Sequence, residues 1–483
     1  MRAGGLGAVV AALALIGCAD DGAPQTRRCG ERLLPDPVAP VTAVAAAPSF
    51  ALGPCGELAV AGREGLRLAG PELASLEAVA TDVTEVRMAP LGGQLWGRGR
   101  DRMLWLDLET RRTTSVEQAR ATGFAGDVAW ACRSDGLHAV DAEGTERRAE
   151  AVAGCERIWS APRAPVVVYV TGEETLAWVD LEGGNGGTLE DVDYQTLRGD
   201  QLRLSPDGRV LQHRVRAGGS WLALFDLEAA AGERLLAAFE SSGGPAVHEA
   251  PGAGHVLAVE LAAEDATVIL TEDLWLNRYE GARFHAFAPG GDRALLRFGR
   301  ETGGAGWTFD VAHLDGTRLE PTGVEVGSGV SVVRSAEGGA AASRYLNAYH
   351  WQPLHVWRWS DGDHAIARDD VARIDWVSEE GVVLARLDDG PAVLIDAGGT
   401  ELARWEAARS VTAWRVNGGD ATLVRVVPAM GAAHRLVRVG ADGEARTIAE
   451  GTSIADVSVD GDGERVAFVR TDGGVSELWA GSL

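Results

Sequence analysis

A short turn phrase recurs along this chain about every 36 to 47 residues, and this period limits the possible folds more than any other feature. The clearest copy is Ser-Pro-Asp-Gly-Arg at 205–209, where proline fixes φ and Asp-Gly accepts the dihedral angles of a tight turn. Degraded copies begin near residues 47, 89, 126, 161, 250, 288, 335, 378, 417 and 459. An interval of this length is typical of the four-stranded blades of a β-propeller.

The segment 202–239 shows how one repeat is built. A run that ends in the turn phrase is followed by alternating runs at 210–216 and 221–227, and a glycine turn then leads to a fourth run. Short alternating runs between Gly and Asp turns predict β-strands. The third run returns as LWLDLE (104–109), LAWVDLEG (176–183) and VWRWSDG (356–362). We therefore predict an all-β chain made of four-stranded blades.

The turns define about eleven repeats. Because propellers usually have about four to eight blades, this number favours two rings; one large ring, or a single ring of seven or eight blades, is the alternative. The last repeat ends at Leu483, directly after a third strand. We expect 38–47 to supply its fourth strand, because closure with chain from both ends hides edges that would otherwise pair with other chains.

Two segments carry a resemblance to a known group of propellers. The phrase at 205–209 and the segment GDGERVAFVR at 461–470 resemble the repeats of TolB-type and WD-repeat-like β-propellers. The resemblance covers roughly residues 45–483 and implies the propeller fold. It implies no particular activity beyond a hint of work in envelope assembly, because the phrase is a folding signal and one fold carries many functions.

The amino terminus has the pattern of an export signal. Arg2 precedes an apolar run of 11 residues at 6–16, which is shorter than the ~20 residues of a membrane-spanning helix but suits a secretory signal. The end of this run, Leu15-Ile16-Gly17-Cys18, resembles the lipobox of bacterial lipoproteins, which implies cleavage after residue 17 and a lipid on Cys18. We therefore expect a signal peptide at 1–17, a lipidated tether at 18–40 and the propeller region at 41–483.

The residue after the lipidated cysteine is Ala19 and not aspartate. In the sorting rule known for enteric bacteria, this favours the outer membrane, on its periplasmic or its surface face. No other apolar run reaches membrane length, so we expect membrane contact only through the lipid on Cys18. The formal net charge is −25, and a surface this acidic repels phosphate backbones. We therefore expect no nucleic-acid partner.

Four cysteines remain besides Cys18, and an even number in an exported chain indicates two disulfides. Four cysteines allow three pairings. We favour Cys29–Cys55 and Cys132–Cys155, because each pair lies within or between neighbouring repeats. No Cys-x-x-Cys spacing is present, so we expect no zinc site.

No recognised catalytic motif occurs in the sequence. Gly-x-Ser-x-Gly, His-Glu-x-x-His, the P-loop and the Rossmann glycine pattern are all missing, so we assign no catalytic residue, cofactor or metal. This favours a non-catalytic binding or scaffold protein of the cell envelope with a protein, peptide or glycan partner. The alternative is a glycan- or peptide-processing enzyme with its site in the propeller channel. Carboxylates about 5–10 Å apart, beside a histidine or tyrosine at one channel mouth, would favour that alternative.

The segment 343–359 is especially rich in aromatic residues. Loops on a rigid scaffold often carry binding residues, and aromatic rings give large contact areas at interfaces. We expect Trp357 and Trp359 to pack on one face of a strand, whereas the spacing of His350, His355 and His364 does not make them converge on a metal. The candidate binding patch consists of Tyr345, Tyr349, His350, Trp351 and His355.

Overall fold

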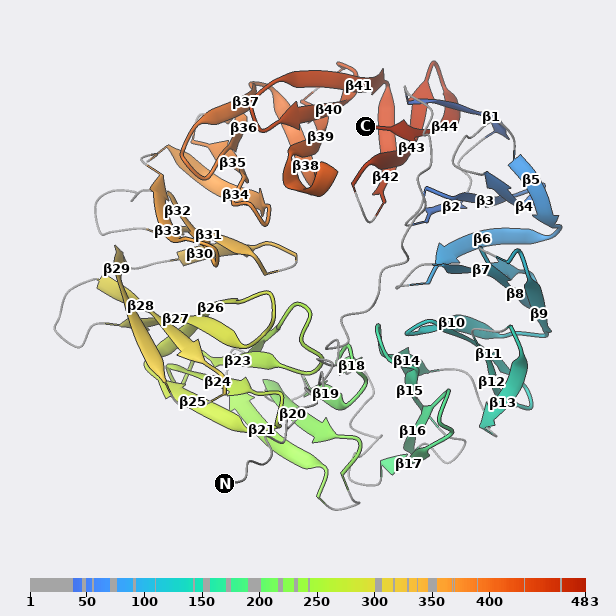
Figure 1. The fold of residues 1–483 in the computed structure, drawn as a ribbon, viewed down its shortest axis with the longest axis horizontal. Coiled ribbons are helices and arrows are strands. Elements are labelled where there is room, and N and C mark those ends of the chain that lie inside the picture. Colours follow the sequence, from blue (N-terminus) through green and yellow to red (C-terminus); the bar gives the residue numbers. More distant parts are fainter. Residues whose placement is uncertain are drawn as a thin grey trace, which may run out of the picture.

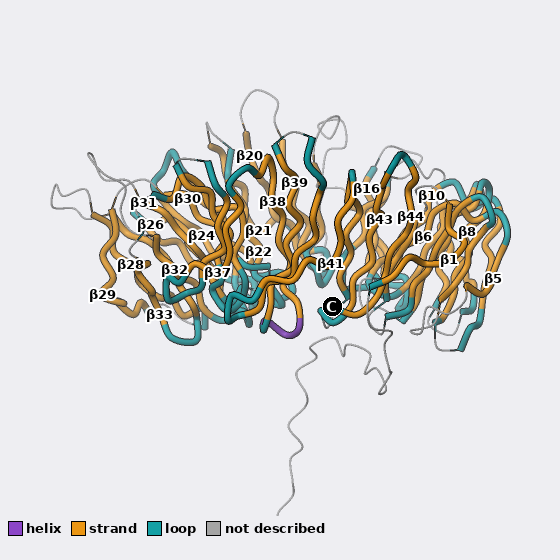
Figure 2. Tube along the Cα trace, turned by 90° about the horizontal axis from the view of Figure 1, so that it is seen from above, coloured by secondary structure: helices purple, strands orange, loops and turns teal. Residues whose placement is uncertain are grey.

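The chain forms a single ring of eleven four-stranded antiparallel sheets, which confirms the predicted all-β propeller and the number of its blades (Figure 1). Seen from the side, the ring is a flat disc (Figure 2). The computed structural model describes residues 38–45, 49–53, 56–69, 76–89, 93–108, 110–141, 144–150, 157–170, 175–189, 201–215, 220–229, 233–241, 244–299, 306–315, 318–327, 330–336, 338–345, 354–366, 368, 370–388, 390–429, 431–460 and 463–483. Within these ranges the one helical element is a 3-10 turn, η2 (Asn417–Gly419), and no helix is long and apolar enough to cross a membrane.

The blades follow one another in chain order. Blades 1 to 4 contain β2 (Ser49–Leu52), β3 (Leu58–Gly62), β4 (Gly65–Ala69) and β5 (Leu76–Ala80); β6 (Val83–Met88), β7 (Gln94–Gly99), β8 (Arg102–Asp107) and β9 (Thr113–Glu117); β10 (Ala121–Ala125), β11 (Val128–Arg133), β12 (Gly136–Val140) and β13 (Glu146–Glu150); and β14 (Ile158–Ser160), β15 (Val166–Val170), β16 (Leu176–Asp180) and β17 (Gly186–Leu189). Blades 5 to 8 contain β18 (Gln201–Leu204), β19 (Val210–Val215), β20 (Ser220–Asp226) and β21 (Leu235–Ser241); β22 (Ala246–Glu249), β23 (Leu257–Leu261), β24 (Ala266–Leu270) and β25 (Leu276–Glu280); β26 (Ala282–Phe287), β27 (Arg293–Gly299), β28 (Gly306–His313) and β29 (Leu319–Gly327); and β30 (Val330–Arg334), β31 (Ala340–Tyr345), β32 (Leu354–Arg358) and β33 (Gly362–Ile366). Blades 9 to 11 contain β34 (Val371–Val377), β35 (Val383–Leu387), β36 (Ala392–Ile395) and β37 (Glu401–Trp405); β38 (Ala408–Val416), β39 (Ala421–Pro428), β40 (His434–Gly440) and β41 (Ala445–Gly451); and β42 (Ser453–Val459), β43 (Arg465–Asp472), β44 (Val475–Ser482) and β1 (Ala39–Ala45).

The ring is closed by chain from both ends, as predicted. β1 is the outermost strand of blade 11 and pairs antiparallel with β44, with Ala39 opposite Ala480 and Pro40 opposite Trp479. A proline is tolerated in β1 because an outermost strand does not need every N–H for pairing. The described part of the chain thus begins in the same blade in which it ends.

The cores between the blades explain why there is one ring and not the two rings that the usual blade number favours. Eleven hydrophobic clusters fill the eleven blade interfaces, and each combines residues from two neighbouring blades. One of them joins blade 11 to blade 1 through Val41, Leu58 and Leu478. Every blade buries one face against the blade before it and the other face against the blade after it. The ring therefore closes only once, between blades 11 and 1, and the described blades form one ring.

The turn phrase has a structural role that explains its repetition. Ser205 Oγ accepts a hydrogen bond of 2.9 Å from the N–H of Val210, where the second strand begins. Ser335 and Ser378 make the equivalent bonds in their own blades. Gly208 in the clearest copy has φ +74°, and a Cβ atom there would lie 2.7 Å from Cβ of Val166 in the preceding blade. The phrase therefore sets both the turn and the approach of one blade to the next.

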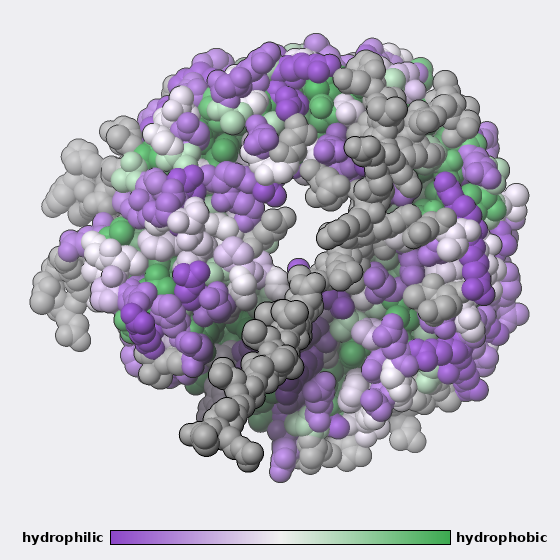
Figure 3. Space-filling view, in the orientation of Figure 1, coloured by the Kyte–Doolittle hydropathy of each residue, from purple (hydrophilic) through white to green (hydrophobic). Residues whose placement is uncertain are grey.

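The antiparallel order places the turns on two faces. The first turn of each blade, between its first and second strands, lies on the same face as its third turn, and we call this the first-turn face. The second turns lie on the opposite, second-turn face. The first strand of each blade lies toward the centre of the ring and the fourth toward its outside (Figure 1). Hydrophilic residues cover most of the visible face, and the centre of the ring is open (Figure 3).

Candidate functional site

The predicted aromatic patch is described only in part. Tyr345 is the last residue of β31, whereas Tyr349, His350 and Trp351 lie outside the described residues. His355 in β32 is half-buried, and its Nδ1 lies 3.0 Å from Oδ2 of Asp363 on the neighbouring strand. The patch therefore stays a prediction.

The two tryptophans of the same segment pack as expected. Trp357 is buried in the core between blades 7 and 8, where its ring lies 6.4 Å from that of Phe309 and 5.9 Å from that of Trp359. His364 lies 3.1 Å from Asp361, a different carboxylate from the one that His355 contacts. Within the described residues no group of three or more His, Cys, Asp or Glu side chains is placed to hold a metal.

The predicted lipidation and disulfide positions lie mostly outside the described residues. Cys132 is buried in β11 and is disulfide-bonded. Cys18, Cys29, Cys55 and Cys155 are not among the described residues. The identity of the partner of Cys132 stays a prediction.

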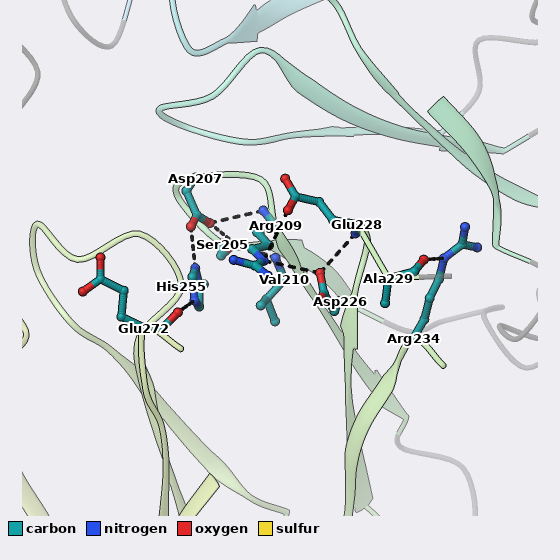
Figure 4. A network of polar contacts seen from close by, with 10 residues as sticks. All are labelled: Ser205, Asp207, Arg209, Val210, Asp226, Glu228, Ala229, Arg234, His255 and Glu272. Carbon is teal, nitrogen blue, oxygen red and sulfur yellow. Dashed lines mark hydrogen bonds and ion pairs between the residues drawn. The ribbon is translucent and has the colours of Figure 1, made fainter. Parts of the chain in front are cut away.

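A polar network connects blades 5 and 6 on the first-turn face (Figure 4). Ser205 Oγ donates to Oδ1 of Asp207 over 2.6 Å, and Nδ1 of His255, in the first turn of blade 6, donates to Oδ2 of Asp207 over 2.6 Å. Nε2 of His255 donates to the backbone carbonyl of Glu272 over 2.8 Å. We call the chain Asp207–His255–Glu272 the latch, because it ties the turn phrase of one blade to two turns of the next.

The latch contains the residue types of a catalytic triad, but in the wrong order for that chemistry. In a triad the histidine lies between the serine and the acid and takes the proton of the serine. Here Asp207 lies between Ser205 and His255, and Ser205 is fully buried and accepts a bond from Val210. Both ring nitrogens of His255 face acceptors, so both must donate, and the imidazole is held as the cation.

The pKa values of the latch agree with this geometry. Burial by itself would lower the pKa of His255, but the hydrogen bond and charge of Asp207 outweigh it, and the pKa is raised. Burial would likewise raise the pKa of Asp207, yet bonds from His255, Ser205 and the N–H of Arg209 hold it below its usual value. Both pKa shifts favour the charged forms of His255 and Asp207, and the latch acts structurally.

The latch holds the third turn of blade 6, which presents an exposed tryptophan. The N–H of Thr271 donates to the carbonyl of Trp275, and the N–H of Trp275 returns a bond of 3.2 Å to Oγ1 of Thr271. Leu274 has φ +61°, a backbone conformation that a bulky residue rarely adopts. Hydrogen bonds between Thr271 and Trp275 thus hold the base of the loop, yet Trp275 is 72% exposed.

Further exposed apolar side chains lie on the same face at the outer edge of three consecutive blades. Leu235 begins β21 and is 54% exposed, Leu276 begins β25, and Leu319 begins β29. Leu236 and Leu274, the neighbours of Leu235 and Trp275, pack against the same core between blades 5 and 6. We call Leu235, Trp275, Leu276 and Leu319 the apolar rim.

The apolar rim has acidic surroundings. The described residues of its three turns include five exposed carboxylates, Glu228, Glu233, Glu272, Asp273 and Asp315. Two arginines lie in the described parts of these turns. Arg234 is buried and donates to the carbonyls of Ala229 and, in blade 4, Thr188, whereas Arg318 is exposed beside Glu320.

A cavity of about 230 Å³ opens on the same face, closer to the channel. It lies between the first strands of blades 6, 7 and 8, and its lining includes His248, Glu249, Phe284, Phe287 and Arg334. It brings a histidine and a glutamate together at the inner edge of the ring. Sequence reasoning missed this site because its residues come from three separate repeats.

The comparisons with known proteins find only distant structural similarity. The sequence matches no known protein family and no curated protein. Among solved structures, a eukaryotic initiation factor is similar with a TM-score of 0.45 and 13% identity, over 71% of this chain and 90% of that one. Dipeptidyl peptidase 4 of Porphyromonas gingivalis has a TM-score of 0.41 and 9% identity, over 89% of this chain and 65% of that one. The extracellular domain of the putative one-component system BT4673 of B. thetaiotaomicron has a TM-score of 0.28 and 10% identity, over 89% and 64%.

Sequence signals for the observed sites were weak. Trp275 stands between two leucines in a third turn, whereas most other third turns are rich in Gly, Asp and Glu, and this difference was a weak signal. Asp207 and His255 are 48 residues apart, and no spacing rule connects them.

Proposed function

We propose that the chain is a membrane-tethered, non-catalytic binding protein of the cell envelope, and that the apolar rim holds a protein partner. The single observation that carries this proposal is Trp275, a large aromatic side chain that is 72% exposed on a loop with a fixed backbone. Tryptophan is among the residues that contribute most to protein interfaces. A loop already held in one conformation loses little entropy on binding.

The charge around the rim favours a partner with basic residues. Five exposed carboxylates lie in the same turns, and the whole chain has a formal net charge of −25. Complementary charge increases the rate of encounter and selects among partners. Lys or Arg side chains of the partner can also bind over the exposed indole, where a cation–π contact contributes roughly 0.5–1 kcal/mol.

The lipid on Cys18 is the second part of the proposal. The ring begins at β1, so about twenty residues separate the anchor from the first strand. Two or three acyl chains anchor a protein stably where a single chain is marginal. The tether would keep the ring beside the membrane without a spanning helix.

The test is co-purification of the full chain from detergent-solubilised envelopes. Trp275→Ser removes the central aromatic residue of the rim. Val475→Ser is the matched control, because Val475 is 62% exposed but begins β44, directly after a second turn and so on the opposite face. Cys18→Ala tests the anchor separately.

We expect one protein to be enriched with the wild type and with Val475→Ser, and lost with Trp275→Ser at unchanged expression. Loss in both serine variants, or in neither, would refute the rim as the binding surface. Cys18→Ala should move the protein from the membrane fraction to the soluble fraction. A membrane-bound Cys18→Ala variant would refute the lipid anchor.

A further inference from the structure

We infer that the cavity between blades 6, 7 and 8 binds a small carboxylic acid with an apolar body, such as a monocyclic aromatic acid. This site is separate from the apolar rim, and its ligand is independent of the protein partner proposed above. The inference rests on three properties of the cavity: which of its charged groups are already occupied, which donor is left, and what the remaining wall consists of.

The carboxylates at the cavity are already paired. Glu249 accepts from Arg203 Nη2 over 2.7 Å through one oxygen and from Gln212 Nε2 over 2.8 Å through the other. Glu260, which lies behind the wall, accepts from His248 Nε2 over 2.9 Å and from the N–H of Phe284 over 3.1 Å. Each of the four oxygens thus already accepts a hydrogen bond from the protein.

Arg334 supplies the donor. Its Nε donates to the carbonyl of His285 over 2.5 Å, and its Nη2 points at the carbonyl of Phe284 over 3.5 Å. These bonds, together with a position 5.0 Å above the Phe284 ring, fix the plane of the guanidinium. Neither bond uses Nη1, whose two N–H groups can therefore donate to a ligand.

The electrostatic setting of Arg334 also favours an anion. Burial lowers the pKa of Arg334, and the charge of Glu260 only partly offsets this effect. A half-buried cation that lacks its full complement of acceptors is stabilised when a carboxylate arrives, and arginine binds carboxylates through strong charge-assisted hydrogen bonds.

Much of the remaining wall is aromatic or apolar. The His248 and Phe284 rings are stacked with their centroids 4.8 Å apart, and Phe287 lies 4.7 Å from Phe284. Pro251 and Ala286 also contribute to the apolar lining. A volume of about 230 Å³ corresponds to roughly seven or eight water molecules at ~30 Å³ each. This is enough for one aromatic ring with a short acidic side chain, and too little for a sugar chain or a nucleotide.

The binding test uses three probes of the same shape and different charge: phenylacetate, benzyl alcohol and benzylamine. Each is titrated into the full-length protein, and binding is followed by ligand-observed NMR and calorimetry. We expect phenylacetate to bind at least about tenfold more tightly than benzyl alcohol, as one charge-assisted hydrogen bond would cause. We expect benzylamine to bind no more tightly than the alcohol. A tripeptide that ends in phenylalanine, compared with its amide, tests whether a peptide carboxyl terminus can supply the same chemistry.

Two variants assign the effect to the cavity. Arg334→Met should reduce phenylacetate affinity by about tenfold or more and leave benzyl alcohol within about twofold. Arg318→Met, an exposed arginine outside the cavity, is its control. Ala336→Phe fills the cavity from an exposed lining position and should abolish binding of both probes, whereas Ala262→Phe, exposed on the opposite face, should not.

The outcomes are distinct. Equal affinity for acid and alcohol, tighter binding of the amine, or unchanged phenylacetate binding in Arg334→Met would overturn the inference. If Arg334→Met fails to fold, the Ala336→Phe variant tests the site instead. Phenylacetate binding that persists in Ala336→Phe would show that the ligand binds elsewhere and would refute the site. Failure of the apolar-rim experiment would leave these results unaffected, because no variant used here changes a rim residue.

Discussion

The latch between blades 5 and 6 makes a quantitative prediction. His255→Leu keeps a side chain of similar size but removes both N–H donors. Asp207 then keeps its bonds from Ser205 and from the N–H of Arg209, and the carbonyl of Glu272 loses its donor. We therefore expect the third turn of blade 6, at 271–275, to open more often while the other blades are unaffected.

The size of the effect follows from these bonds. A hydrogen bond to a charged group contributes about 1.5–3 kcal/mol, and a neutral one about 1 kcal/mol. The Asp207 side chain is one-third exposed, so water replaces part of what it loses, and the lower end applies. Since neighbouring contributions are not additive, we expect about 2 kcal/mol, or roughly a thirtyfold larger opening constant for the turn.

The assay is amide hydrogen exchange of peptides that cover 271–280. Local exchange is preferable to a global unfolding curve because repeat-built proteins do not always unfold in one step. His313→Leu is the matched control: His313 contacts Glu320 over 3.1 Å in a half-exposed pair, and loss of such a pair costs at most about 1 kcal/mol. Unchanged exchange at 271–280 in His255→Leu, or an equal increase in every blade, would refute the role of the latch.

The same comparison should depend on pH. The pKa of His255 is raised above its usual value of 6.5, so its contribution is complete below pH 6.5 and is lost as the pH rises through the raised value. The pKa of Asp207 is lowered below 3.8, so its contribution is complete above 3.8 and is lost as the pH falls through the lowered value. The protection of the wild type relative to His255→Leu should therefore be largest between pH 3.8 and 6.5. Burial lowers the pKa of His285 well below 6.5, so the effect of His285 on stability changes with pH in the opposite direction. Because His285 is present in both the wild type and His255→Leu, its effect cancels in the comparison.

Three further predictions concern the ring itself. Gly208→Ala should lower the free energy of unfolding, measured with urea, by about 2 kcal/mol, because the position combines a left-handed φ with a Cβ contact at 2.7 Å. Gly281→Ala is the control: Gly281 has φ +66° but open space around it, so the substitution should cost only about 1 kcal/mol. Equal costs for the two variants would contradict the steric argument. Val41→Asp places a carboxylate in the core of the closing blade, so it should lower the free energy of unfolding by about 3 kcal/mol or more and expose β1 to proteases. Ala39→Asp, at the exposed first position of the same strand, should do neither. Equal behaviour of the two variants would contradict closure by β1. Peptide mapping of the unreduced protein should recover Cys132 linked to Cys155, and a linkage from Cys132 to Cys29 or Cys55 would refute the pairing predicted from the sequence.

Much of the blade architecture was predictable because its causes are local. The turn phrase sets a tight turn within five residues, Ser205 bonds to Val210 within the same turn, and alternation of side chains selects strands. Closure by β1 was also predictable, because a final repeat with three strands leaves one edge unpaired and a spare strand precedes the first repeat. The role of Trp357 and Trp359 in packing followed from their spacing of two residues, although Trp359 lies one residue beyond the end of β32.

The sequence by itself thus determined the four-stranded blades and the way the ring closes, since each depends on bonds within one repeat or on a missing edge strand. Its turns indicated about eleven repeats but left a single ring of seven or eight blades open. Only the tertiary structure decided that the eleven blades share one ring, because that depends on side chains of neighbouring blades filling eleven common cores. The latch from Asp207 to His255 and the cavity at Arg334 were likewise decided by tertiary structure. Both join residues from different repeats. Such residues are brought together by the angle between neighbouring blades, and the repeat period in the sequence does not specify that angle.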